Sequence, residues 1–155
     1  ADLGVWMVNV HVSGGRKMME ACVNKLASYS EPPLLIGVTV LTSMAEEDLR
    51  EVGIHSAPID HVLALGGLAK ESGLDGVVCS AHEASVLKAG LSSSFKLVTP
   101  GIRPNFAEKG DQQRIMTPRE ALLAGSDYLV IGRPITQAES PIEALKMVMQ
   151  EMSFT

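Results

Sequence analysis

Residues 73–80 read Gly-Leu-Asp-Gly-Val-Val-Cys-Ser, and this stretch decides the fold. A glycine that can end a helix leads through an aspartate into an apolar run with the continuous hydrophobicity of a buried strand. The same order recurs in Gly125-Ser126-Asp127-Tyr128-Leu129-Val130, and more loosely in Asp2-Leu3-Gly4-Val5. Each copy predicts a junction from a helix into a strand, so consecutive strands are expected to run in the same direction.

Apolar runs and helical segments alternate along the whole sequence. Five runs are expected to be buried parallel strands because their apolar residues are continuous: Val5–Val10, Leu34–Leu41, Gly76–Cys79, Lys96–Thr99 and Tyr128–Ile131. Helical spacing occurs in Arg16–Leu26, Ala45–Val52, Ile59–Glu71, Ala81–Ala89, Pro118–Ala124 and Pro141–Met152. The order is β then α, repeated.

Two architectures follow from such repeats. Right-handed crossovers between parallel strands give an open doubly wound sheet or a closed barrel of eight units. Five units in 155 residues have about 31 residues each, and eight would need the roughly 250 residues typical of a (β/α)8 barrel. We therefore expect an α/β fold of the TIM-barrel family. With no linker-like break in composition, residues 1–155 are expected to be the C-terminal part of one barrel domain, whose N-terminal units are absent.

Composition argues against several classes of protein. With 46% hydrophobic and 20% charged residues, the chain is expected to be globular rather than disordered. A formal net charge of −5 provides no broad basic surface for nucleic acid. The longest apolar run is far shorter than the ~20 residues of a membrane helix, so no membrane partner is expected. The spacing of Cys22 and Cys79 suggests neither a metal site nor a disulfide, which favours two buried thiols in the cytoplasm.

Candidate site residues lie just after the strands, because ligands of parallel βα folds bind at the carboxyl ends of the strands. The last two strands lead into Pro100-Gly101-Ile102-Arg103 and Gly132-Arg133-Pro134. Gly132 would let a ligand approach the main chain, while Arg103 and Arg133 offer paired N–H donors that match a phosphate. We predict a phosphate site here. In the alternative interpretation Arg133 is a surface ion-pair partner and Gly132 only a turn.

The polar segment Gly101–Met116 is long for a loop between a strand and a helix. We interpret it as a lid or binding loop with Gly101 and Gly110 as hinges. The alternative is a disordered surface excursion. Its composition is compatible with both.

Three further polar residues follow strands. His11 and His82 could act as acid or base groups near neutral pH, although neither has an obvious partner and a structural role is the more common one. Thr42 could orient a ligand through one hydrogen bond, or cap the helix that begins near Ala45.

A family resemblance covers essentially the whole chain. It rests on Val5–His11, Val38–Met44, Gly73–Ser80, Leu97–Pro104 and Val130–Gln137. Its most specific parts are Thr99–Pro104, Gly110–Arg114 and Ile131–Pro134. On these residues the sequence closely resembles bacterial orotidine 5′-phosphate decarboxylase.

The resemblance implies a cofactor-free (β/α)8 enzyme of pyrimidine nucleotide synthesis, which converts orotidine 5′-phosphate to UMP and CO2 as a homodimer. It also implies the substrate-binding residues and makes the polar loop a phosphate lid. The phosphate would be held by Arg103, Gln112, Gly132 and Arg133, the pyrimidine contacted by Thr42, and the base flanked by Pro100.

The sequence departs from the family at the catalytic motif. The family's Asp-x-Lys-x-x-Asp array does not occur in the 155 residues, so no catalytic residue is assigned to this chain. Such an array sets up a fixed field that disfavours the substrate carboxylate, and its lysine protonates the carbon that loses CO2. We expect a decarboxylase as the complete protein and an inactive isolated chain. The alternatives are a non-catalytic phosphate-ligand-binding fragment and a related sugar-phosphate decarboxylase or epimerase, against which the run Thr99–Arg103 argues.

Overall fold

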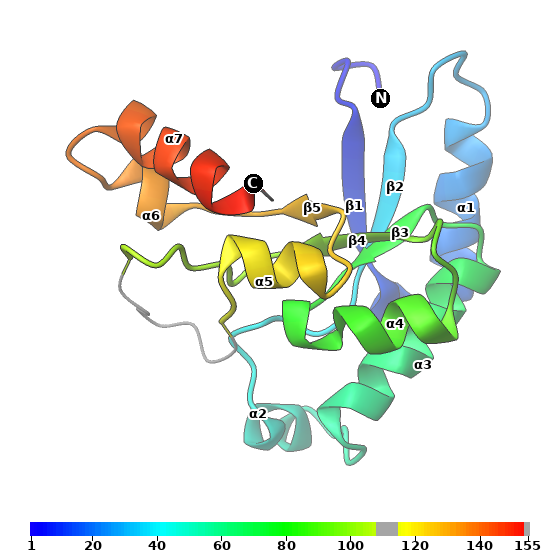
Figure 1. Ribbon diagram of the computed structural model, residues 1–155. Coiled ribbons are helices and arrows are strands. Elements are labelled where there is room, and N and C mark those ends of the chain that lie inside the picture. Colours follow the sequence, from blue (N-terminus) through cyan, green and yellow to red (C-terminus); the bar gives the residue numbers. More distant parts are fainter. Residues whose placement is uncertain (108–114, 154–155) are drawn as a thin grey trace.

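The computed structural model describes residues 1–107 and 115–153 and contains a sheet of five parallel strands with helices packed against it (Figure 1). The strands are β1 (Met7–His11), β2 (Leu34–Val38), β3 (Gly76–Val78), β4 (Lys96–Thr99) and β5 (Tyr128–Leu129). The helices are α1 (Arg16–Leu26), α2 (Glu46–Glu51), α3 (Pro58–Glu71), α4 (Ala84–Gly90), α5 (Pro118–Leu123), α6 (Arg133–Thr136) and α7 (Pro141–Met152). Two 3-10 turns, η1 (Val12–Gly14) and η2 (Ala81–Glu83), follow β1 and β3.

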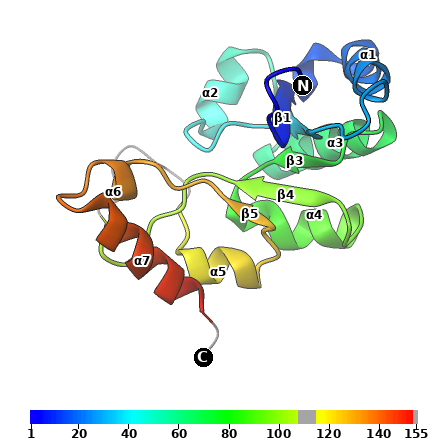
Figure 2. The ribbon, with the colours of Figure 1, turned by 90° about the horizontal axis from the view of Figure 1, so that it is seen from above.

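The sheet order distinguishes between the two architectures that the sequence left open. Neighbours in the sheet follow the order β1-β2-β3-β4-β5, and every pairing is parallel. A doubly wound sheet reverses its strand order at a switch point, whereas a barrel does not. Seen from above, α1, α3, α4 and α5 gather on one side of the sheet (Figure 2). The chain therefore has barrel-type topology.

The main core lies between the central strands and the helices. Leu35, Val77 and Leu97 of β2, β3 and β4 are buried together with Met19 of α1 and Val62 of α3. Shielding these apolar side chains from water is the main stabilising contribution to such a layer. None of the described helices is long and apolar enough to cross a membrane.

The two edge strands correct the expectation of five buried strands. In β1, Asn9 and His11 are exposed and the other side chains only partly buried, and both residues of β5 are partly buried. Among the described residues, each of these strands pairs with a neighbouring strand on one side only, so its side chains are less covered than those of the central strands. Cys22 is also only partly buried, while Cys79 is buried as expected.

Several expected strands are longer than the observed ones. The first begins at Met7 rather than Val5, the second ends at Val38 rather than Leu41, and the last ends at Leu129 rather than Ile131. The second strand stops because its partner β3 ends at Val78. Beyond this ladder Val40 is buried without strand pairing while Leu41 is 48% exposed, a difference that hydrophobicity alone cannot predict.

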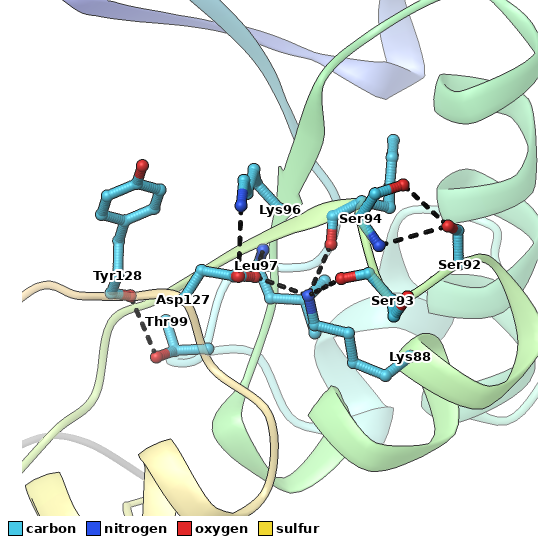
Figure 3. A network of polar contacts seen from close by, with 10 residues as sticks. Lys88, Ser92, Ser93, Ser94, Lys96, Leu97, Thr99, Asp127 and Tyr128 are labelled. Atoms are coloured by element: carbon cyan, nitrogen blue, oxygen red, sulfur yellow. Dashed lines mark hydrogen bonds and ion pairs between the residues drawn. The ribbon is translucent and has the colours of Figure 1, made fainter.

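The repeated aspartates have a structural role. A carboxylate oxygen of Asp75 accepts the backbone N–H of Leu35 at 2.7 Å, and one of Asp127 accepts that of Leu97 at 2.8 Å. Asp127 also pairs with Lys88, whose Nζ lies 2.7 Å from the same oxygen (Figure 3). Each aspartate thus satisfies a donor at the start of the neighbouring strand, which explains why the motif recurs where a helix meets a strand.

Gly76 in the same motif is required by close packing. A Cβ atom at this position would lie 2.2 Å from the carbonyl oxygen of Lys96 on β4. The backbones of β3 and β4 can therefore pair here only if residue 76 lacks a side chain.

Candidate functional site

One cleft lies beyond the carboxyl ends of β4 and β5, the last two strands of the sheet. It has a volume of about 390 Å³, and seven residues line it: Arg103, Phe106, Ala107, Arg133, Pro134, Gln137 and Ala138. We call residues 103–107 the Arg103 wall and residues 133–138 the Arg133 wall. The structure thus brings together the two arginines that the sequence singled out, although they are far apart in the chain.

Arg103 is fixed in the cleft by its surroundings. It is only 8% exposed, its Nη1 donates to the carbonyl oxygen of Ile102 at 3.0 Å, and its backbone N–H donates to the carbonyl oxygen of Met116 at 3.0 Å. Gly101 turns the chain before it with φ +76°, a left-handed conformation that favours glycine. Because a guanidinium remains protonated even when buried, the Arg103 wall carries a permanent positive charge.

Arg133 belongs to a more open part of the cleft. It is exposed and begins α6, the short helix after β5. The preceding Gly132 accepts backbone N–H bonds from Ile135 and Thr136 at 2.9 and 3.1 Å, and a Cβ atom placed on it would meet nothing within 4 Å. The main chain at Gly132 is therefore accessible to a ligand, as its prediction as a binding residue requires.

Gln137 is a cleft residue that the sequence analysis missed. It follows α6, and its backbone N–H donates to the carbonyl oxygen of Arg133 at 3.0 Å. The turn of helix between them was not predicted. The spacing of four residues between Arg133 and Gln137, with Pro134 at the helix start, was the available signal.

The two residues predicted to contact the base, Thr42 and Pro100, are not among those that line this cleft. Thr42 is buried, and the helix cap proposed for it is wrong, because Ala45 is the N-cap of α2 and donates its N–H to Asp48. Pro100 is partly buried and comes directly after β4. Gln112 lies outside the described residues. The roles of all three remain predictions.

The two ends of the polar loop are joined at the site. Ile102 and Met116 form a parallel bridge, so the segments leaving and re-entering the fold lie side by side. The predicted hinge Gly110 and the middle of the predicted lid lie outside the described residues. The ring of His82 has a partner after all, since its Nε2 lies 2.8 Å from the carbonyl oxygen of Ile115. This contact supports a structural role for His82, whereas His11 is exposed at the end of β1.

Comparisons with known protein sequences show the family of this chain. The sequence model of the Orotidine 5'-phosphate decarboxylase / HUMPS family matches residues 1–148. Orotidine 5'-phosphate decarboxylase from Chromobacterium violaceum is 61% identical over 153 residues, which cover 99% of this chain and 62% of that protein. The same enzyme from Vibrio cholerae is 65% identical over 149 residues, covering 96% and 64% of the two chains.

Solved structures show the same fold. A crystal structure of orotidine 5'-phosphate decarboxylase from Lactobacillus acidophilus superposes with a TM-score of 0.81 at 36% identity, covering 97% of this chain and 65% of that one. An uncharacterized conserved protein from Geobacillus kaustophilus gives a TM-score of 0.81 at 40% identity, covering 99% and 66%. The expected α/β fold of the TIM-barrel family is confirmed. The chain spans 62–64% of the length of the two relatives named first, and it belongs to the orotidine 5'-phosphate decarboxylase family.

Proposed function

We propose that this chain supplies the phosphate- and base-binding part of an orotidine 5′-phosphate decarboxylase, which converts orotidine 5′-phosphate to UMP and CO2. The observation that carries the proposal is the cleft that Arg103 and Arg133 both line, beyond the ends of consecutive strands. The substrate is inferred from relatives about 60% identical, which are named orotidine 5'-phosphate decarboxylases. No cofactor, nucleic acid or membrane is part of this proposal.

The phosphate would bind between the two walls of the cleft. Each guanidinium can donate two N–H groups to phosphate oxygens, and such charge-assisted bonds contribute about 1.5–3 kcal/mol each. Arg103 is already held in place, so ordering it on binding costs little, and Arg133 would reach the phosphate from the more open part of the cleft. Gly132 would allow the phosphate to approach the main chain, and Gln112 would add a neutral donor.

Binding the phosphate can also assist the reaction at the base. Interactions with a non-reacting part of the substrate can hold the reacting part in an environment that it would otherwise avoid. We propose that Thr42 and Pro100 hold the pyrimidine in this way. The substrate carboxylate leaves as CO2, its bonding electrons remain on the ring carbon, and that carbon takes up a proton.

The proton donor would come from outside these 155 residues. The family's Asp-x-Lys-x-x-Asp array is absent from the sequence, so we propose that the chain alone does not release CO2 from orotidine 5′-phosphate. An assay of UMP formation on chain of verified mass, 16.5 kDa, tests this statement directly. Turnover by that material would contradict it.

We also propose that the five βα units are the C-terminal part of a single barrel domain. The support is the pairing of β1 and β5 on one side only, together with relatives that are longer than this chain. A homodimeric assembly and a cytoplasmic location, both implied by the family resemblance, belong to the same proposal.

The phosphate assignment is tested by Arg133→Ala. We expect UMP affinity to fall about 10- to 150-fold, because a charge-assisted hydrogen bond is lost, while uridine affinity stays the same. Titration calorimetry with both ligands measures the difference. Arg50→Ala is the matched control, since it removes an exposed arginine of α2 that pairs with Glu46 away from the cleft. Equal losses for UMP and uridine would contradict the assignment.

A further inference from the structure

Glu151 near the end of α7 accepts two hydrogen bonds from the Arg103 wall. One carboxylate oxygen accepts the Nδ2–H of Asn105 at 2.9 Å, and the other accepts the backbone N–H of the same residue at 3.2 Å. Asn105 lies between Arg103 and Phe106, two residues that line the cleft. A side chain of the last described helix is thus bound to the wall of the candidate phosphate site.

The same helix also contacts the opposite wall. Helix α7 packs against α6, which begins with Arg133, and Figure 1 shows the two helices side by side. The N-terminal part of α7 follows the Arg133 wall in the chain. Glu151, in the last turn of α7, is hydrogen-bonded to the Arg103 wall. Helix α7 connects the two sides between which a phosphate would be bound.

Electrostatics alone does not explain a carboxylate at this place. A negative charge beside a cationic cleft weakens the binding of an anion, and a partly exposed polar pair contributes little to the stability of the fold. Both carboxylate oxygens are instead engaged by donors of one residue of the wall. The two hydrogen bonds therefore fix the position of Asn105 relative to α7.

We propose that Glu151 is a positioning residue, which holds the Arg103 wall at the separation from Arg133 that a phosphate ester requires. The inference rests on the proposed function of the cleft. It adds a residue 46 positions beyond Asn105 in the chain that touches neither the base nor the phosphate.

Glu151→Gln tests the proposal through the sign of its effect. If charge were all that mattered, removing a carboxylate would tighten UMP binding. A glutamine, however, has only one acceptor oxygen, and its NH2 group would face one of the two donors of Asn105. We therefore expect UMP affinity to fall about 5- to 10-fold, with uridine affinity unchanged, as measured by titration calorimetry on the chain.

Two further variants test whether Glu151 affects UMP affinity through its hydrogen bonds to Asn105. Glu143→Gln removes the same charge from the first turn of α7, where Glu143 pairs with Lys146, and should change UMP affinity less than twofold. Asn105→Ala should weaken UMP about as much as Glu151→Gln, and the double variant should be no weaker than either single one. Additive losses would overturn the proposal.

The outcomes separate this inference from the proposed function. If the unaltered chain prefers UMP to uridine, but Glu151→Gln binds UMP as well as or better than it, only the positioning role is overturned. If the unaltered chain binds inorganic phosphate without preferring UMP, and Glu151→Gln weakens phosphate, the decarboxylase assignment fails and the positioning role stands. Binding of neither UMP nor phosphate by the unaltered chain overturns both.

Discussion

At the scale of single residues, one position of the repeated helix-to-strand motif, Ser126, holds a polar side chain in a buried place. The equivalent position in the other well-matched copy of the motif is Leu74, and both side chains are buried. Within the described part of the chain, the Ser126 hydroxyl has no hydrogen-bond partner. A buried hydroxyl without a partner costs about 1–3 kcal/mol of desolvation.

Replacing this serine should therefore stabilise the fold. We expect Ser126→Ala to raise the free energy of unfolding by up to about 1 kcal/mol, because the unsatisfied hydroxyl is removed and little volume is lost. Urea denaturation measures the change. Ser72→Ala is the matched control: that buried hydroxyl donates to the carbonyl oxygen of Leu68 at 2.8 Å, so its loss should destabilise. A destabilising Ser126→Ala would show that its hydroxyl is satisfied after all.

Which site residues could be predicted depended on how each reaches the cleft. Arg103 and Arg133 were found because each lies four residues beyond the end of a strand, and the carboxyl ends of parallel strands share one edge. Glu151 could not be found in this way, because its link to Asn105 depends on how α7 packs against the rest of the chain. Thr42 and Pro100 also follow strands, yet they lie outside the cleft. The rule that ligands bind at the carboxyl ends of parallel strands identifies the edge of the sheet, but not which side chains line the cleft there.

At the scale of elements, continuous apolar runs and helical spacing located the five strands and six of the seven helices found in residues 1–107 and 115–153. Helix α6 was missed because it has a single turn, Arg133–Thr136, too short for a periodic pattern. Strand ends were missed where two paired strands stop together, as at Val38 beside Val78. Helix starts are set more locally. For α5, Thr117 and Glu120 form a capping box before and within the first turn.

This capping box predicts a pH-dependent contribution to stability. Hydrogen bonds from the hydroxyl and backbone N–H of Thr117 lower the pKa of Glu120 below its ordinary value of 4.5, and nearby His82 adds to the effect. A carboxyl whose pKa is lowered by folding stabilises the fold above its unfolded pKa, and that contribution disappears as the pH falls through the lower folded pKa.

We expect Glu120→Gln to cost a few tenths of a kcal/mol near neutral pH, because the pair is exposed and screened by solvent. The difference from the unaltered chain should shrink as the pH falls below about 4.5. Denaturant unfolding across this pH range measures it. In a Thr117→Ala background the same substitution should show a weaker pH dependence, since the hydrogen bond from the threonine hydroxyl is gone while the backbone N–H bond and His82 remain. A constant difference at all pH values would contradict the capping interaction.

At the scale of the whole molecule, the sheet is curved but its edges are open. The rings of Trp6, just before β1, and Tyr128 of β5 lie 5.3 Å apart between centroids, so the first and last strands approach each other. Unit length and strand direction predicted the barrel class, whereas this curvature depends on side-chain packing that the sequence pattern does not contain. Trp6 remains 63% exposed and Val5 42% exposed just before β1, which pairs with only one of the described strands.

An open edge with exposed apolar side chains predicts self-association of the chain, because unpaired backbone groups can pair with another copy. We expect light scattering to show an average mass that rises with concentration. Val5→Lys should shift the chain toward the monomer, since a charged side chain at a sheet edge disfavours pairing with a second strand. Val86→Lys is the matched control: this valine of α4 is 44% exposed but lies away from the sheet edges. If both lysine variants associated equally, contacts through the edge of β1 would be ruled out, and a chain that stays monomeric at every concentration would show that curvature alone protects the open sheet.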